Sequence, residues 1–85
     1  MLNPFAVYNT IMKNEERKMI AYIVACINEF ARDAGMTTGE SFRYLYDNGG
    51  IDFLIEFYDT EHLLSFHEAV GDLKSVTQKT GGMIA

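Results

Sequence analysis

Apolar residues recur at helical spacing along most of the chain, and the clearest stretch predicts a long helix over residues 15–34. Asn14 is a favourable N-cap before it, and Gly35 is a favourable stop after it. The apolar stripe consists of Met19, Ile23, Cys26, Ile27, Phe30 and Ala34, widened by Ile20, Val24 and Ala31. A stripe this broad is typical of the central helix of a small core.

A second helix is predicted over residues 38–47. Thr37 and Glu40 have the spacing of a capping box, in which the two side chains bond each other's backbone N–H groups. The sequence Asn48-Gly49-Gly50 then ends the helix, because glycine adopts the left-handed conformation without penalty. The expected inner face of this helix consists of Phe42, Leu45 and Tyr46.

The pattern over residues 51–58 predicts a third helix with an unusually wide apolar face. Ile51, Leu54, Ile55 and Tyr58 share one side, and Phe53 and Phe57 extend the apolar arc to roughly 200°. Asp52, Glu56 and Asp59 are left on a narrow polar strip. A surface helix does not need so much apolar surface, so either this helix is central or part of it faces a partner. The candidate interface residues are Phe53, Phe57 and Tyr44.

A second capping box, Ser65 with Glu68, begins a fourth predicted helix over residues 66–79 that Gly81-Gly82 ends. Its single apolar stripe consists of Phe66, Ala69, Val70, Leu73 and Val76. No alternating apolar run is bounded by hairpin turns. The expected fold is therefore all-α, a compact bundle of about four helices in one domain over residues 14–82.

The two ends are expected to lie apart from this domain. Residues 1–13 form an N-terminal extension in which Asn3-Pro4 could begin a short extra helix, and residues 83–85 form a tail. A chain of 85 residues buries only roughly 60–65% of the surface that its unfolded state exposes. Its stability is therefore expected to be marginal, and oligomerisation would help.

Charge excludes some classes of partner. Twelve acids and seven bases give a formal net charge of −5, which disfavours nucleic acid and anionic membrane surfaces. The two helices around Asn48-Gly49-Gly50 could be read as a helix-turn-helix, but residues 51–58 hold two acids and none of Arg, Lys, Asn or Gln. A basic protein partner is compatible with the charge, and so is simple solubility.

The sequence also indicates a compartment. The longest apolar run, residues 19–27, is too short to span a bilayer, and no basic region precedes an apolar core at the N-terminus. We therefore expect a cytoplasmic protein. Its single cysteine, Cys26, lies in that apolar run and is expected to be a core residue rather than a nucleophile.

No motif predicts an enzyme, a cofactor or a metal site. Glu61-His62 and His67-Glu68 are clustered metal-type residues, but the histidines are five apart and HExxH needs them four apart on one helix. The alternative is a structural polar pair, with His62 ordering the loop before Ser65 by bonding a free carbonyl at the end of the third helix. Asp52, Glu56 and Asp59 look like solvated helix positions.

From Ala21 to Gly82 the chain resembles an uncharacterised bacterial family of short helical proteins, a domain of unknown function. The segments that carry the resemblance are residues 27–31, 36–38, 42–45, 50–54, Tyr58, Glu61-His62, Leu64-Ser65, Ala69-Val70 and Asp72-Leu73. The resemblance implies no catalytic residue. It does imply a genetic neighbourhood, because members look like small partners encoded beside toxin-type proteins, including ADP-ribosyltransferase-like ones.

Four functions compete at this point. The leading hypothesis is a small protein-binding module, antitoxin-like or a regulatory partner of a neighbouring gene product. The alternative is a homo-oligomeric structural domain, such as a homodimer in which Phe53 and Phe57 meet their copies. A metal protein or enzyme built on Glu61, His62 and His67, and a DNA regulator, are less favoured.

Overall fold

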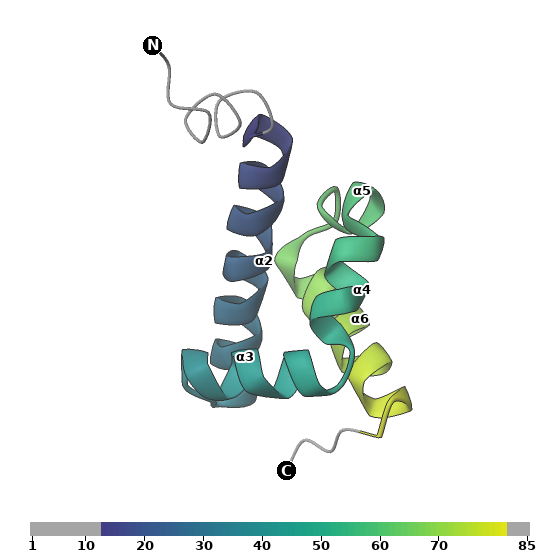
Figure 1. Ribbon diagram of the computed structural model, residues 1–85. Helices are drawn as coiled ribbons and strands as arrows, with labels where there is room; N and C mark the ends of the chain where they lie inside the picture. Colours follow the sequence, from purple (N-terminus) through teal and green to yellow (C-terminus); the bar gives the residue numbers. More distant parts are fainter. Residues whose placement is uncertain (1–12, 82–85) are drawn as a thin grey trace.

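The regular structure in the computed structural model, which describes residues 13–81, is entirely helical (Figure 1). Its helices are α2 (Lys13–Ala34), α3 (Thr38–Asp47), α4 (Gly50–Glu56), α5 (Tyr58–Glu61) and α6 (Phe66–Lys79). The all-α fold is thus confirmed. The expectations for residues 1–12 and for 82–85 lie outside the described residues.

The helices α3, α4 and α6 pack around the C-terminal half of α2. In Figure 1, α3 crosses the lower end of α2, α4 and α5 lead back along α2, and α6 returns behind them. An ion pair between Lys74 of α6 and Asp33 of α2 joins two of these elements at the surface. No helix among residues 13–81 combines the length and the apolar character needed to cross a membrane.

The core lies where α2 meets the other helices. Its buried members are Cys26, Ile27, Phe30, Leu45, Leu54, Ala69, Val70 and Leu73. Cys26 is fully buried and unpaired, so the prediction that it is a core residue is confirmed. The predicted stripe of α2 is too wide, however, because Ile20 and Val24 are exposed.

The structure confirms the predicted end of α2 but not its predicted start. Gly35 has φ 68° and the Met36 N–H donates to the Ala31 carbonyl at 2.9 Å, which is the hydrogen bond of a Schellman stop. Asn14, expected as the N-cap, lies inside the first described turn, because the helical backbone already includes Lys13. Asparagine favours a cap position but does not force one.

The predicted bounds of α3 are confirmed, and so is its capping box. The Glu40 N–H donates to Thr37 Oγ1 at 3.1 Å, and the Thr37 N–H donates to Glu40 Oε1 at 2.8 Å. The predicted inner face is only one third right, because Leu45 is buried whereas Phe42 and Tyr46 are exposed. Ser41 takes the inner position, and its hydroxyl donates to the Ile27 carbonyl of α2 at 2.8 Å. A small hydroxyl residue fits this close crossing, and hydrophobic periodicity does not detect it.

The predicted third helix over residues 51–58 is wrong in its bounds. α4 ends at Glu56, and Phe57, with φ −107° and ψ 22°, separates it from the short helix α5. The Phe57 carbonyl accepts from the N–H of Thr60 and of Glu61, at 3.1 and 2.8 Å, so the chain begins a new turn in a new direction. This break turns Tyr58 and Glu61 into the protein and leaves Phe57 exposed.

The fourth predicted helix is confirmed as α6. Ser65 caps it by accepting the Glu68 N–H at 3.1 Å. The expected reciprocal bond is replaced, because Glu68 Oε1 accepts from the Ser65 hydroxyl at 3.3 Å. Ala69, Val70 and Leu73 of the predicted stripe are buried, whereas Phe66 is exposed.

Candidate functional site

About a third of the chain carries acids and no strong base. Between Arg43 and Lys74 the chain contains no Lys or Arg, and we call residues 44–73 the acidic segment. Its acids are Asp47, Asp52, Glu56, Asp59, Glu61, Glu68 and Asp72. The segment covers the end of α3, all of α4 and α5, and the first half of α6. The side chains of this segment therefore carry negative charge that no Lys or Arg of the segment neutralises.

Large exposed apolar side chains lie among the acids of this segment. Ile55 and Phe57 are about half exposed, and Leu63, in the loop between α5 and α6, is 77% exposed. On the polar side of the same elements, Asp52, Glu56 and Asp59 are all exposed, and none of them takes part in an ion pair within the described part of the chain. Exposed apolar groups among unpaired acids are typical of a recognition surface.

The three predicted interface residues fall in different surroundings. Phe53 is partly buried against the core, and its ring centroid lies 5.2 Å from that of the exposed Phe57. Tyr44 stacks on Phe30 at 5.7 Å, and its hydroxyl donates to Thr77 Oγ1 at 3.2 Å. Tyr44 therefore has partners within its own chain, and Phe57 is the member of the trio that offers most surface to another molecule.

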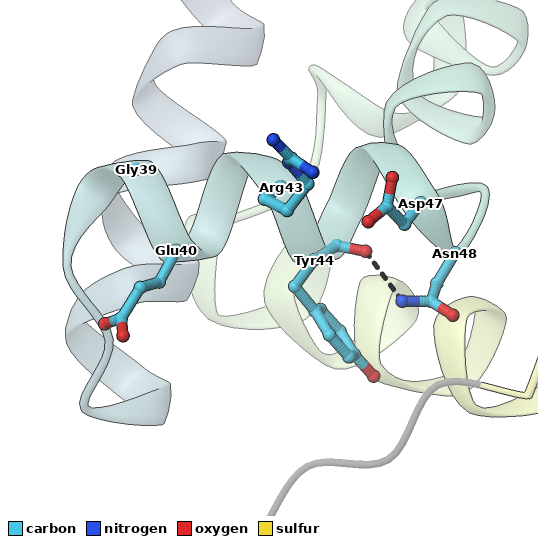
Figure 2. Close-up of a pocket in the computed structure, with 6 residues that line it drawn as sticks. All are labelled: Gly39, Glu40, Arg43, Tyr44, Asp47 and Asn48. Carbon is cyan, nitrogen blue, oxygen red and sulfur yellow. Dashed lines mark hydrogen bonds between the residues drawn. The ribbon is translucent and has the colours of Figure 1, made fainter.

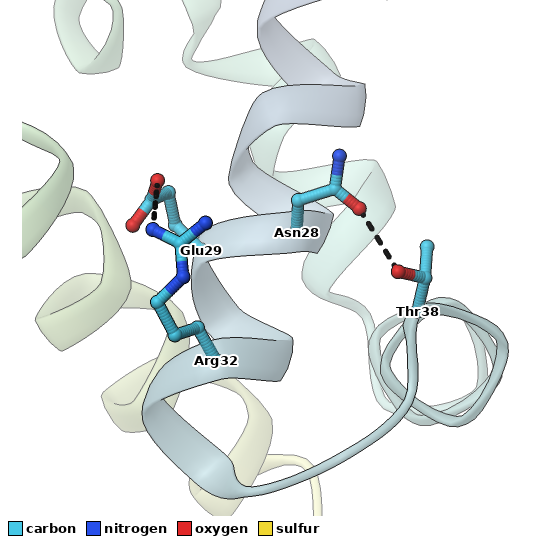
Figure 3. A network of polar contacts seen from close by, with 4 residues as sticks. All are labelled: Asn28, Glu29, Arg32 and Thr38. Atoms are coloured by element: carbon cyan, nitrogen blue, oxygen red, sulfur yellow. Dashed lines mark hydrogen bonds and ion pairs between the residues drawn. The ribbon is translucent and has the colours of Figure 1, made fainter.

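A second exposed apolar surface lies in the angle between α2 and α3. The Thr38 hydroxyl donates to Asn28 Oδ1 at 3.1 Å where the two helices cross (Figure 3). On each helix, the residues four and eight positions away from the bonded residue lie on the same face as that residue. These positions include Ile20 and Val24 on α2 and Phe42 and Tyr46 on α3, and we call these four residues the corner surface. All four are exposed, Tyr46 to 64%.

Sequence reasoning missed the corner surface because it assigned these residues to the core. Periodicity places Ile20 and Val24 beside the buried stripe of α2 and cannot tell where along the helix α3 crosses it. Because α3 crosses α2 at Asn28, it does not cover Ile20 and Val24, which precede the crossing. The ring contact between Phe42 and Tyr46, at 5.8 Å, keeps the two aromatic side chains of α3 together at the surface.

Glu61 is the most unusual polar residue in the described part of the protein. Only 5% of its surface is exposed, and its Oε1 atom is buried without a hydrogen-bond partner. Its backbone carbonyl accepts the Tyr22 hydroxyl of α2 at 2.9 Å. Tyr22 also packs edge-on against Tyr58 and stacks on Phe66, with centroids 5.6 and 6.0 Å apart. An aromatic cluster thus meets the backbone of Glu61 through Tyr22.

The surroundings of Glu61 favour its neutral form. Burial raises the pKa of Glu61 to about 7, and a hydrogen bond with Asp72, the charge of Asp72 and the charge of Glu68 add to the effect. Burial also raises the pKa of the Tyr22 phenol and of the Cys26 thiol, which the charge of Glu61 raises further. A fully buried thiol with a raised pKa is a poor nucleophile.

His62, the other half of the predicted polar pair, is exposed and has a structural contact. Its Nδ1 atom lies 2.7 Å from the Tyr58 carbonyl, at hydrogen-bonding distance, so Nδ1 is the protonated nitrogen. The imidazole also stacks on the Tyr58 ring at 4.5 Å. His62 and Glu61 thus have separate environments, because one lies at the surface and the other inside.

The remaining candidate groups do not assemble into one site. Within residues 13–81, no three side chains of His, Cys, Asp or Glu are grouped so that they could hold a metal ion. A hollow beside α3 is lined by Gly39, Glu40, Arg43, Tyr44, Asp47 and Asn48. The side chains that line it spread away from α3 in different directions (Figure 2), and Asn48 Nδ2 is already bonded to the Tyr44 carbonyl. Convergent polar groups, which a small-molecule site needs, are missing from this hollow.

Comparisons with known proteins give one match. Residues 21–80 match a family described as a protein of unknown function, DUF3791. No curated protein and no solved structure matches the chain. The matched region contains most of α2 and all of α3, α4, α5 and α6, and so includes the acidic segment and Glu61. The chain therefore belongs to the DUF3791 family.

Proposed function

We propose that this protein is a protein-binding module that docks a basic partner protein on its acidic segment. The observation that carries the proposal is the combination found there: seven acids of which all but Glu61 are exposed or partly exposed, no Lys or Arg, and the exposed apolar side chains of Ile55, Phe57 and Leu63. Neither feature alone selects a partner. Together they fit a surface that offers both positive charge and apolar pockets.

The two features have different roles in binding. Unpaired acids attract a basic protein over several ångströms and raise its association rate, an effect that salt screens. Exposed apolar side chains such as Leu63 supply the area that leaves water on contact, and such anchors supply most of the affinity of protein interfaces. The same negative field disfavours DNA, RNA and anionic membranes as partners.

The resemblance of the chain to small partners of toxin-type proteins supports a finer version of the proposal. The first partner to test is the product of the neighbouring gene, which an antitoxin-like or regulatory protein would bind in the cytoplasm. This chain would act by occupying a surface of that protein and would catalyse no reaction.

Titration calorimetry with the purified neighbouring gene product tests the proposal at 50 and 500 mM NaCl. We expect micromolar or tighter binding that weakens at the higher salt concentration. Glu56→Lys should weaken binding about tenfold or more, and so should Leu63→Ser, because each removes one of the two features. Phe42→Ser, on the corner surface and outside the acidic segment, is the matched control and should bind like the wild type. Absence of a complex at micromolar concentration contradicts this partner, and equal losses in all three variants contradict the site.

The corner surface favours a second candidate function, a homodimer. Three of its residues, Ile20, Val24 and Phe42, precede the acidic segment, so two copies could meet there with less charge repulsion than at Phe57. Sedimentation equilibrium checks this hypothesis. Tyr46→Glu should dissociate the dimer and Phe57→Glu should not; the reverse result supports the interface at Phe53 and Phe57, and a monomer of 9.6 kDa at high concentration excludes both.

A further inference from the structure

Glu61 joins three parts of the molecule. It is the last residue of α5, its backbone carbonyl accepts the Tyr22 hydroxyl of α2 at 2.9 Å, and its side chain meets Asp72 of α6. The same carbonyl accepts the Leu64 N–H at 3.0 Å, which shapes the loop that leads to α6. Displacement of Glu61 would therefore disturb α5, this loop and the contact with α2 together.

Within residues 13–81, no ion pair with a cation compensates the Glu61 carboxyl. The titratable groups around it are Tyr22 and Cys26 on α2, Glu68 and Asp72 on α6, and Tyr58 and His62 on its own segment, while α4 offers only the exposed Asp52 and Glu56. The His62 Nδ1–H is committed to the Tyr58 carbonyl. Two carboxyls can share a hydrogen bond only if one of them holds a proton, and the more buried one holds it at lower cost.

We propose that Glu61 and Asp72 form a proton-operated latch. One proton held between the two carboxyls keeps α5 and residues 62–65 closed against α2, and loss of this proton releases them. The unpartnered Oε1 atom of Glu61 fits this assignment, because a buried neutral carboxyl tolerates a missing partner far better than a buried carboxylate does.

The direction of the pH response follows from the raised pKa. The pKa of Glu61 is about 7 in the closed protein and 4.5 when free, so the closed form binds more protons between these values. Closure is therefore favoured fully below about pH 4.5, weakens as pH rises, and loses the contribution of Glu61 above pH 7. The latch would respond in the neutral range.

Opening has a specific consequence at Cys26, the single cysteine of the chain. Cys26 is fully buried, and Tyr22, which bonds Glu61, also bonds the Cys26 thiol. Release of α5 would free Tyr22 and admit solvent to the thiol. The rate at which a thiol reagent labels Cys26 therefore reports the state of the latch.

Pulsed labelling of Cys26 between pH 5.5 and 8.5 tests the proposal, with each rate divided by the rate of the urea-unfolded chain to remove the titration of the thiol itself. For the wild type, protection of Cys26 should fall by up to about tenfold per pH unit between pH 5.5 and about 7, where only the closed form holds the proton, and should level off at higher pH. Glu61→Gln, which keeps the shape without the charge, should give a flat, protected profile. Glu56→Gln, at an exposed acid of α4, should retain the wild-type profile.

Two outcomes overturn the latch. One is constant protection of the wild type across this range, and the other is a Glu61→Gln profile that follows the wild type. If Glu61→Gln does not fold, the carboxyl carbon of Glu61 can be titrated by NMR in the wild-type protein. A midpoint near pH 7 supports the latch, and a midpoint near the ordinary value of 4.5 overturns it. The experiment needs no binding partner, so its result is independent of the proposed function.

Discussion

At the scale of single residues, the glycine with the least space around it in the described structure is Gly50, the first residue of α4. A Cβ atom built there would lie 2.8 Å from Leu45 Cδ2 and 3.2 Å from both the Cβ and the backbone oxygen of Leu45. Part of this contact is backbone, which cannot move aside as a flexible side chain can. Gly50 therefore allows α4 to leave α3 at close range.

Gly50→Ala should destabilise the protein by about 1–3 kcal/mol through overpacking. Gly71→Ala is the matched control, because nothing lies within 4 Å of a Cβ at that exposed position inside α6. Gly71→Ala should instead stabilise the protein by about 0.5–1 kcal/mol, since alanine costs less backbone entropy in a helix. Urea unfolding measures both changes. Equal stability of the two variants would contradict the argument from close approach.

The role of each glycine could be predicted only in part from the sequence. Asn48-Gly49-Gly50 marks a helix end, and Gly49 has φ 81° as a left-handed stop requires. The need for space at Gly50 depends on the approach of Leu45, which no local pattern records. The burial of Glu61 was unpredictable for the same reason, because it depends on the break at Phe57 and on Asp72 of α6.

At the scale of elements, the best predicted helices were α3 and α6, which both begin with a side-chain cap. The bounds 38–47 and 66–79 agree with α3 and α6, since the caps at Thr37 and Ser65 act within four residues of chain. The division of the third predicted helix into α4 and α5 follows from tertiary contacts instead. Apolar spacing continues smoothly through Phe57, so it gives no sign of the break that separates α4 from α5 there.

The Thr37 capping box gives a prediction for a whole element. Thr37→Ala should cost about 1 kcal/mol, because the Glu40 N–H loses its acceptor at the exposed start of α3. Thr37→Ser keeps a hydroxyl in the same place and should stay within about 0.5 kcal/mol of the wild type. Thermal unfolding followed by circular dichroism compares the three proteins. A loss in Thr37→Ser as large as in Thr37→Ala would show that the methyl group, and not the cap, stabilises α3.

At the scale of the whole molecule, charge is unevenly distributed. All the Lys and Arg residues lie outside residues 44–73, whereas seven of the twelve acids lie inside. The ion pairs Arg32–Glu29 and Lys74–Asp33 use acids from outside the acidic segment. The segment therefore repels itself, which costs stability but keeps a negative surface open for a partner. The segment also supplies no Lys or Arg that would lower the pKa of Glu61, which burial raises.

Self-repulsion of the acidic segment predicts that one charge reversal should stabilise the protein. Glu56 is exposed at the end of α4, where the helix dipole also disfavours an acid, so Glu56→Lys should add about 0.3–1 kcal/mol at low salt. Asp52 lies in the first turn of α4, where an acid is favourable, so Asp52→Lys should gain less stability.

Both differences in stability should shrink in 1 M NaCl, which screens charges beyond about 3 Å. Urea unfolding at the two salt concentrations measures them. A gain in Glu56→Lys that persists unchanged at high salt would mean that repulsion is not its source. The same variant also distinguishes a loss of folding from a loss of binding. If Glu56→Lys is more stable than the wild type and yet no longer binds the partner, the substitution has damaged the binding surface and not the fold.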